Sequence, residues 1–206
     1  MDPVALAIFG FIAFIFSVMI HEVSHGVVAE WLGDPTARQA GRITLNPLKH
    51  IDPMGSLLLP AVLILIGSPV ILGWAKPVPY DPRFLPNPKA AAGKIAGAGP
   101  LSNFILAIAF ALLARLVIAT GWNAALADAF AQIVLLNISL GVFNLVPLPP
   151  LDGSKVLFAL LPAGRTGYAL MAFLERYGFI LIFAFLFFAG SFLYPVVRTI
   201  FNLLVG

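Results

Sequence analysis

The residues best suited to chemistry lie late in the first apolar stretch, where His21, Glu22 and His25 form a His-Glu-x-x-His pattern. On a helix, positions i and i+4 lie one above the other on the same face, so both imidazoles can reach one Zn²⁺ ion. Glu22 then lies beside the metal rather than on it, where it can accept a proton from a water molecule that the metal activates. The pattern therefore predicts a zinc site with a general base.

A purely structural interpretation competes with this prediction. His and Glu side chains also join helices inside a bilayer through hydrogen bonds. However, residues 4–31 contain no Lys or Arg, and three ionisable groups within five residues are costly in a membrane segment unless they serve a site. We therefore favour the metal site.

A catalytic zinc site usually has three protein ligands and an open position, so a third ligand is needed. The chain has no cysteine, which leaves histidine and carboxylate side chains. Asp152 stands out because it follows an apolar stretch and lies in a proline-rich turn before Gly153, which would let the turn approach the metal closely. A helix-capping role explains the same position equally well, because Asp is common at helix starts.

Composition predicts that the chain lies in a lipid bilayer. Hydrophobic residues make up 61% of its 206 residues and charged residues 10%, against about 25% charged in soluble proteins. The basic residues are scattered and the net charge is only +3, which argues against a nucleic-acid partner. We expect one polytopic domain over residues 1–206, with a first helix that is not cleaved as a signal peptide.

The apolar stretches predict an all-α integral membrane protein with about four to six transmembrane helices. Spanning helices are expected at residues 4–32, 95–119, 124–146 and 179–194. Residues 155–161 suggest a short surface helix, and the proline-rich residues 75–94 suggest a loop. Alternating β-branched residues at 41–47 predict a short extended, β-like segment after the first helix.

Residues 55–74 are apolar but interrupted by proline and glycine, and they decide the topology. If Asp152 is to reach the two histidines, this stretch must enter and leave the membrane on one side, as a re-entrant hairpin shielded by other helices. That arrangement puts ten of the twelve basic residues on one side, whereas a full crossing splits them seven to five. The positive-inside rule therefore favours the hairpin, with the site toward the cytoplasm of a cell membrane and the N-terminus outside.

Three motifs occur in the order expected for the site-2 protease family of intramembrane metalloproteases, peptidase family M50, and resemble its signatures. They are His21-Glu22-Val23-Ser24-His25, the Gly-Pro-Leu-Ser-Asn of residues 99–103, and the Asn-Leu-Val-Pro-Leu-Pro-Pro-Leu-Asp-Gly of residues 144–153. Residues 41–53 and 73–79 are similar to a small prokaryotic branch without PDZ or CBS domains. The resemblance extends from about residue 9 to residue 160.

This resemblance implies a zinc-dependent endopeptidase that cuts a single-pass membrane protein within or next to its transmembrane helix. It implies that His21, His25 and Asp152 bind one zinc ion per chain, and that Glu22 activates the water.

The resemblance also suggests that Asn103 and Asn144 line the cleft and bind substrate. An amide there could hold the substrate backbone or the developing oxyanion, but both amides could equally join helices. Residues 41–45 could hold the unwound substrate by strand addition. His50 matches the branch pattern, and we favour a structural role for it over metal ligation.

Three rival functions are weighed against this one. A zinc carrier or transporter would need the ligands but not Glu22, and a silent scaffold for transmembrane segments would not need an intact metal site. A zinc protease of the prenyl-protein-processing type would need a Glu ligand far downstream, where Glu175 is the only Glu and lacks that context.

Overall fold

In the computed structural model of the chain, the residues described are 3–58, 61–62, 65–66 and 75–206. Within them the chain forms helices and turns and no strand. The elements are α1 (Pro3–Trp31), α2 (Thr36–Gln39), η1 (Pro47–Lys49), η2 (Pro53–Leu58), η3 (Pro82–Phe84), α4 (Pro88–Thr120), α5 (Ala124–Asn144), α6 (Asp152–Leu160) and α7 (Arg165–Val205).

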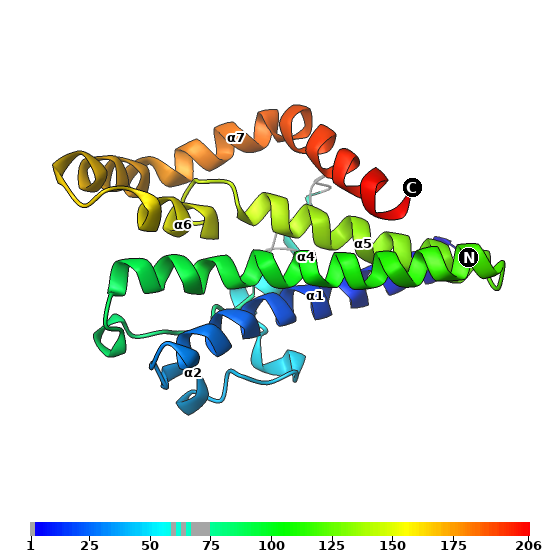
Figure 1. Cartoon of the computed structure of the whole chain (residues 1–206), viewed down its shortest axis with the longest axis horizontal. Helices are drawn as coiled ribbons and strands as arrows, with labels where there is room; N and C mark the ends of the chain where they lie inside the picture. The colour runs from blue at the N-terminus through cyan, green and yellow to red at the C-terminus, as the bar shows by residue number, and fades with distance from the viewer. Residues whose placement is uncertain (1–2, 59–60, 63–64, 67–74) are drawn as a thin grey trace.

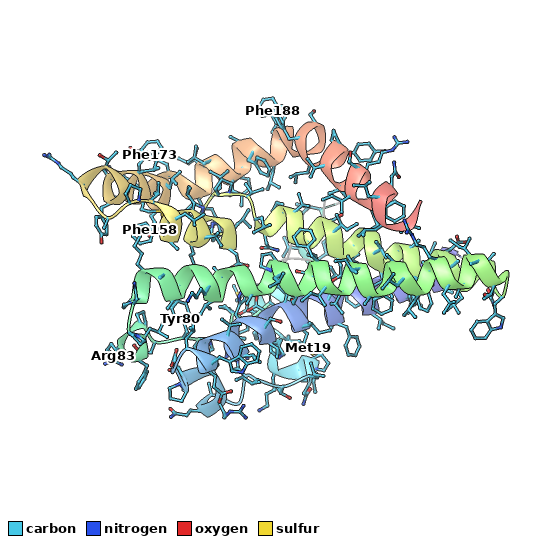
Figure 2. The ribbon with its side chains drawn as sticks, in the orientation of Figure 1. Met19, Tyr80, Arg83, Phe158, Phe173 and Phe188 are labelled. Carbon is cyan, nitrogen blue, oxygen red and sulfur yellow. The ribbon has the colours of Figure 1, made fainter. Side chains whose placement is uncertain are left out.

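Four helices in the described part of the chain are long and apolar enough to cross a membrane. These spans are Ile8–Trp31, Pro88–Thr120, Ala124–Asn144 and Arg165–Phe188. Figure 2 shows Phe173 and Phe188 pointing outward from α7, and more than half of each side chain is exposed. Large exposed apolar side chains on spanning helices suit contact with lipid. The predicted all-α, multi-pass membrane architecture is confirmed.

Helix α4 lies at the centre of the bundle and packs against α1, α5 and α6, while α7 covers α5 (Figure 1). Small side chains mediate much of this packing. Ala107 and Ala111 of α4 lie in one buried cluster with Val134 and Ile138 of α5. Helices that associate in a bilayer use small residues in this way, because they let the backbones approach closely.

The chain leaves α1 and enters α4 at the same end of the bundle. Ala29, near the end of α1, shares a buried cluster with Ala91 and Ile95, near the start of α4. Both chain termini lie at the opposite end (Figure 1). This arrangement agrees with the topology needed to bring α6 to the histidines. The hairpin expected at residues 55–74 falls largely outside the described residues.

The β-like segment predicted at residues 41–47 is wrong. The chain there forms turns and bends and leads into η1, where the Asn46 side chain accepts a hydrogen bond from the Leu48 N–H at 3.1 Å. Alternating β-branched residues favour a strand only when a second strand completes its hydrogen bonds. None of the described residues supplies such a strand, so strand addition at residues 41–45 loses its structural basis.

Helix α4 begins at Pro88, seven residues before the predicted start. The Asn87 side chain accepts a hydrogen bond from the Ala90 N–H at 3.2 Å. Proline at the first helical position needs no donor and has a suitable φ, so Asn87-Pro88 is a strong start signal. The loop predicted at residues 75–94 therefore ends earlier than expected.

Helix α7 also begins earlier than predicted, at Arg165 rather than near residue 179. The charged residues Glu175 and Arg176 interrupt the apolar sequence. For this reason the first part of α7, before residue 179, was not predicted as helix. Both residues are exposed, while the buried positions 167, 171, 174 and 178 recur every three or four residues. That spacing is typical of one helix face packed against the protein.

Candidate active site

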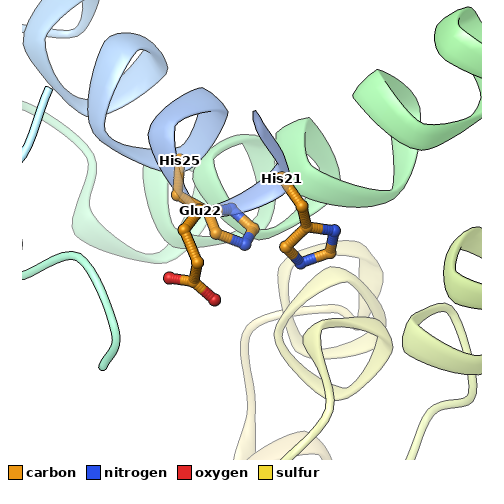
Figure 3. A group of neighbouring side chains, drawn as sticks. All are labelled: His21, Glu22 and His25. Carbon is orange, nitrogen blue, oxygen red and sulfur yellow. The ribbon is translucent and has the colours of Figure 1, made fainter. Parts of the chain in front are cut away.

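His21 and His25 lie one turn apart on α1, and the Glu22 side chain lies beside them (Figure 3). The ligand-capable atoms of the three side chains all lie within 4.8 Å of one another. The spacing of the sequence pattern thus gives the expected cluster on one helix.

Asp152 reaches the same place from the start of α6. Its Oδ2 atom lies 3.0 Å from Nε2 of His21 and 3.3 Å from Nε2 of His25. Donor atoms arranged tetrahedrally about 2.0–2.1 Å from a zinc ion stand roughly 3.3–3.4 Å apart. Two imidazole nitrogens and one carboxylate oxygen therefore fit a zinc ion in both chemistry and spacing.

The Asp152 side chain does not cap its helix. Leu151 is the N-cap residue of α6, and no side chain makes a capping hydrogen bond there. The carboxylate is directed at the two imidazoles instead, as a metal ligand at this place would be.

Gly153 fixes where α6 begins. A Cβ atom at this position would lie 2.2 Å from the carbonyl oxygen of Leu145 and 2.5 Å from that of Val146. Only glycine lets α6 start so close to the end of α5. The sequence suggested that this glycine lets the turn approach the metal. In the structure it instead lets the start of α6 pack against the backbone of residues 145 and 146, and this packing places Asp152.

A buried chain of hydrogen bonds orients His21. Its Nδ1 atom lies 2.6 Å from Oδ1 of Asn103, whose amide donates to Asn137 at 3.0 Å, and Asn137 donates to Ser17 at 3.0 Å. Because the Asn103 nitrogen is a donor, its oxygen must accept, so Nδ1 of His21 carries the proton. The lone pair of Nε2 is then free to bind a metal.

His25 is oriented in the same manner by the backbone. Its Nδ1 donates to the carbonyl oxygen of Ile95 at 2.6 Å. Histidines that ligate metals usually donate their other ring N–H to such an acceptor. Both rings of the pair are therefore prepared to present Nε2.

Gly99 gives the imidazoles their space. A Cβ atom on this residue of α4 would lie 2.5 Å from Nε2 of His21 and 2.6 Å from Cε1 of His25. Gly99 belongs to the Gly-Pro-Leu-Ser-Asn motif, but its role at the site was not predicted from the sequence. Asn137 and Ser17 were missed altogether, although polar residues within apolar spans are a signal in themselves.

Glu22 is held from outside the helical bundle. Its Oε2 atom accepts a hydrogen bond from the Val78 N–H at 3.1 Å. No sequence pattern indicates this contact, which joins residues 56 positions apart.

The structure places the remaining predicted residues less close to the chemistry. Asn103 is 0% exposed with both amide atoms engaged, which supports the helix-joining alternative for it. Asn144 donates to Leu140 of its own helix at 3.0 Å. Substrate binding by these two residues stays a prediction. His50 is buried in the loop after α2, where its Nε2 lies 2.9 Å from the carbonyl oxygen of Thr44.

Comparisons with known proteins agree with this geometry. The family model for peptidase family M50 matches residues 115–189. YwhC of Bacillus subtilis, named as a candidate zinc metalloprotease, is 40% identical over 184 residues, which cover 86% of this chain and 80% of YwhC. Rip2 of Mycolicibacterium smegmatis, named in the same way, is 30% identical over 194 residues, covering 85% of this chain and 72% of Rip2. No solved structure matches the chain. The chain therefore belongs to peptidase family M50 and is a zinc metalloprotease of the site-2 protease type.

Proposed function

We propose that this protein is an intramembrane endopeptidase that hydrolyses a peptide bond within or next to the transmembrane helix of a single-pass membrane protein. One observation carries the proposal: Asp152 of α6 meets His21 and His25 of α1 inside a bundle with four membrane-competent helices. Family membership argues against the carrier and scaffold alternatives.

The depth of the site supports a membrane-embedded substrate. His21 lies ten residues before Trp31, where the first span ends, so it is roughly 15 Å from that end at 1.5 Å per residue. A peptide in bulk water would have to enter the apolar layer to reach this depth. A transmembrane segment, or the part of a chain next to one, is already there.

His21, His25 and Asp152 would hold one zinc ion per chain. When bound, zinc supplies a Lewis acid that polarises the scissile carbonyl and lowers the pKa of a water molecule. Asn103 and the Ile95 carbonyl each accept the Nδ1–H of one imidazole ring, which would leave both Nε2 atoms free to bind the ion.

Glu22 moves the proton. Its carboxylate lies close enough to the imidazole nitrogens to accept a proton from a water molecule attacking beside them. The water oxygen forms a bond to the carbonyl carbon, the carbon–nitrogen bond breaks, and the leaving nitrogen takes the proton that Glu22 accepted. The carboxylate is regenerated, so one water molecule is consumed for each bond cleaved.

The substrate must be extended where it is cut, because a helix keeps its carbonyl groups in hydrogen bonds. Asn144 ends α5 a short turn before Asp152 and is half-buried, so it is our candidate for contact with the extended backbone. Asn144→Ala should slow cleavage and leave the zinc content unchanged.

The test uses the full chain purified in detergent with a single-pass membrane protein, and maps the fragments by mass spectrometry. Wild-type protein should cut in or beside the transmembrane segment. Glu22→Gln should lower the rate at least about 100-fold, the typical minimum contribution of a general base. Glu30→Gln is the matched control, because Glu30 lies on α1 but pairs with Arg38 at the surface. Cleavage that survives Glu22→Gln would contradict the assignment of the base.

We also propose that the protein lies in the cell membrane with its active site toward the cytoplasm. The chain has no cysteine, so single cysteines can report sidedness. Cysteines at Gln39, Lys89 and Arg165 should label from the cytoplasmic face, and one at Trp122, in the turn between α4 and α5, from the opposite face. Labelling of Gln39 and Lys89 from different faces would refute this topology.

A further inference from the structure

The Glu22 carboxylate contacts a proline-rich segment that packs on α1, here called the strap and defined as residues 76–81. Val78 carries the only backbone N–H between Lys76 and Tyr80, because residues 77 and 79 are proline. That single N–H donates to Glu22. Between the two prolines, the strap therefore has a single backbone hydrogen-bond donor, and its acceptor is the Glu22 carboxylate.

A buried arginine ties down the start of the strap. Arg42 is 7% exposed, and its guanidinium donates to the carbonyl oxygens of Lys76 at 2.9 Å, Pro77 at 3.1 Å and Lys49. The Lys76 and Pro77 carbonyls immediately precede the Val78 N–H. Arg42 thus fixes the two residues that set where this N–H points.

A buried aspartate ties down the far end of the strap. Asp34 is 0% exposed; its Oδ2 accepts the Asp81 N–H at 2.6 Å and its Oδ1 accepts the Thr36 N–H at 2.9 Å. Both anchors belong to the turn region that follows α1. The strap is therefore fastened by charged side chains before and after Val78.

The strap also lies directly against α1. A Cβ atom on Gly26 would lie 2.9 Å from Cγ1 of Val78, so glycine one turn after Glu22 leaves room for the valine. Pro79 restricts Val78 to an extended conformation, and proline lowers the conformational freedom of the segment as a whole. The segment is thus fastened at both ends, packed in the middle and stiffened by its own sequence.

We infer that Arg42 and Asp34 are positioning residues for the proton-transfer step: they hold the strap, and the strap holds the Glu22 carboxylate through the Val78 N–H. The inference rests on the proposed function, in which Glu22 is the base. Loops position catalytic groups less precisely than helices do, so a base that is oriented by a loop needs such anchors.

The first experiment removes the donor alone. Val78→Pro deletes the N–H, and the extended conformation that Pro79 already imposes on residue 78 is one that proline can adopt. Val78→Ala keeps the N–H and shortens the side chain. Val78→Pro should lower kcat about 10- to 100-fold, the effect of misplacing a catalytic group by about 1 Å. KM and zinc content should not change, because neither depends on the strap contact. Val78→Ala should lose far less of kcat.

The second experiment removes an anchor. Arg42→Gln should lower kcat to a similar extent, and Arg42→Lys, which keeps a cationic donor, should restore part of the loss. Arg38→Gln is the matched control, because Arg38 lies in the same loop region but pairs with Glu30; it should behave as wild type. The double variant Arg42→Gln/Val78→Pro should be no slower than Val78→Pro alone, since both changes break one contact.

Hydrogen exchange on the metal-free protein gives a readout that is independent of activity. The Val78 amide should exchange faster in Arg42→Gln and in Glu22→Ala than in wild type, and at the wild-type rate in Arg38→Gln. If Arg42→Gln does not fold, Val78→Pro and the exchange of the Val78 amide in Glu22→Ala decide the question.

Three results would overturn the inference: wild-type kcat in Val78→Pro, loss of zinc in Val78→Pro, or additive losses in the double variant. Glu22→Gln is measured in the same preparation. If Glu22→Gln is inactive while Val78→Pro is fully active, only the inference about the strap fails. If Glu22→Gln is active, the proposed function of Glu22 fails instead.

Discussion

His21 and Glu22 are neighbours in the sequence, yet different parts of the molecule support them. His21 is held by a hydrogen-bond chain through Asn103 and Asn137, which lie on two other spanning helices and are completely buried. Glu22 is held by the Val78 N–H of a loop. Helix packing thus orients the proposed metal ligand, and a fastened loop orients the proposed base.

This contrast suggests that binding and catalysis can be separated by mutation. Changes on the histidine side, inside the helical bundle, should alter the zinc content or the zinc affinity. Changes on the glutamate side should alter turnover and leave zinc in place. The predictions below probe the histidine side, from the largest expected effect to the smallest.

Removing an imidazole should have the largest effect. His21→Ala and His25→Ala should each lower the zinc content from about one ion per chain toward zero, because two remaining ligands do not close a site. Glu22→Gln should keep its zinc, because Glu22 is assigned as base rather than ligand. Elemental analysis of the purified variants measures both. Full zinc in the double His variant would remove the basis for the site.

Asp152→Asn should keep the fold but weaken zinc binding about 100-fold or more, with a comparable loss of cleavage. Asparagine retains an oxygen but not the negative charge that holds a dication beside two neutral imidazoles. Zinc titration against a chelator and matched thermal melts measure affinity and folding. Wild-type affinity in this variant would leave the site without its third ligand, and His50 or Asp52 would be the next candidates.

Gly99→Ala should displace the imidazoles and weaken zinc binding about 10- to 100-fold, as changes around first ligands do. The added methyl group would lie 2.5 Å from Nε2 of His21, so the ring must shift. Gly97→Ala is the control on the same helix, because its methyl group would lie 3.9 Å from the nearest atom, on Val156. Equal zinc affinity in the two variants would show that α4 does not confine the histidines.

Asn103→Leu should have the smallest effect on this side, about a 10-fold loss of zinc affinity. Leucine fills the space but removes the acceptor that fixes the His21 tautomer. It also leaves the Asn137 amide without one partner, so a loss of stability of about 1 kcal/mol should accompany the change. Isothermal titration and thermal melts separate the two effects. If zinc affinity is unchanged, Asn103 only joins helices.

The sequence predicted those features that depend only on residues close together in the chain. The i, i+4 spacing of His21 and His25 places both on one helix face regardless of what surrounds it. Apolar length predicted the spanning helices in outline. For Asp152 the sequence left two roles open, a zinc ligand and a helix cap, because a carboxylate after a proline-rich turn suits both. Only the neighbours of its oxygen atoms distinguish the two roles.

The secondary-structure predictions failed where neighbouring residues indicated different structures. Residues 41–47 have strand-like composition, but a strand needs a partner that the sequence does not reveal. The start of α4 was signalled by Asn87-Pro88 and obscured by the surrounding prolines. The first half of α7 was obscured by charges at 175 and 176, which face outward and so do not interrupt the buried face of the helix.

By itself, then, the sequence determined which residues are the candidates for the chemistry and that the chain forms helices able to span a membrane. The tertiary structure alone decided how those residues are held. The clearance at Gly99, the hydrogen-bond chain through Asn137 and the contact of Val78 with Glu22 join segments that are far apart in the chain. Such contacts depend on helix packing and on the path of a loop, and no spacing along a single segment encodes them.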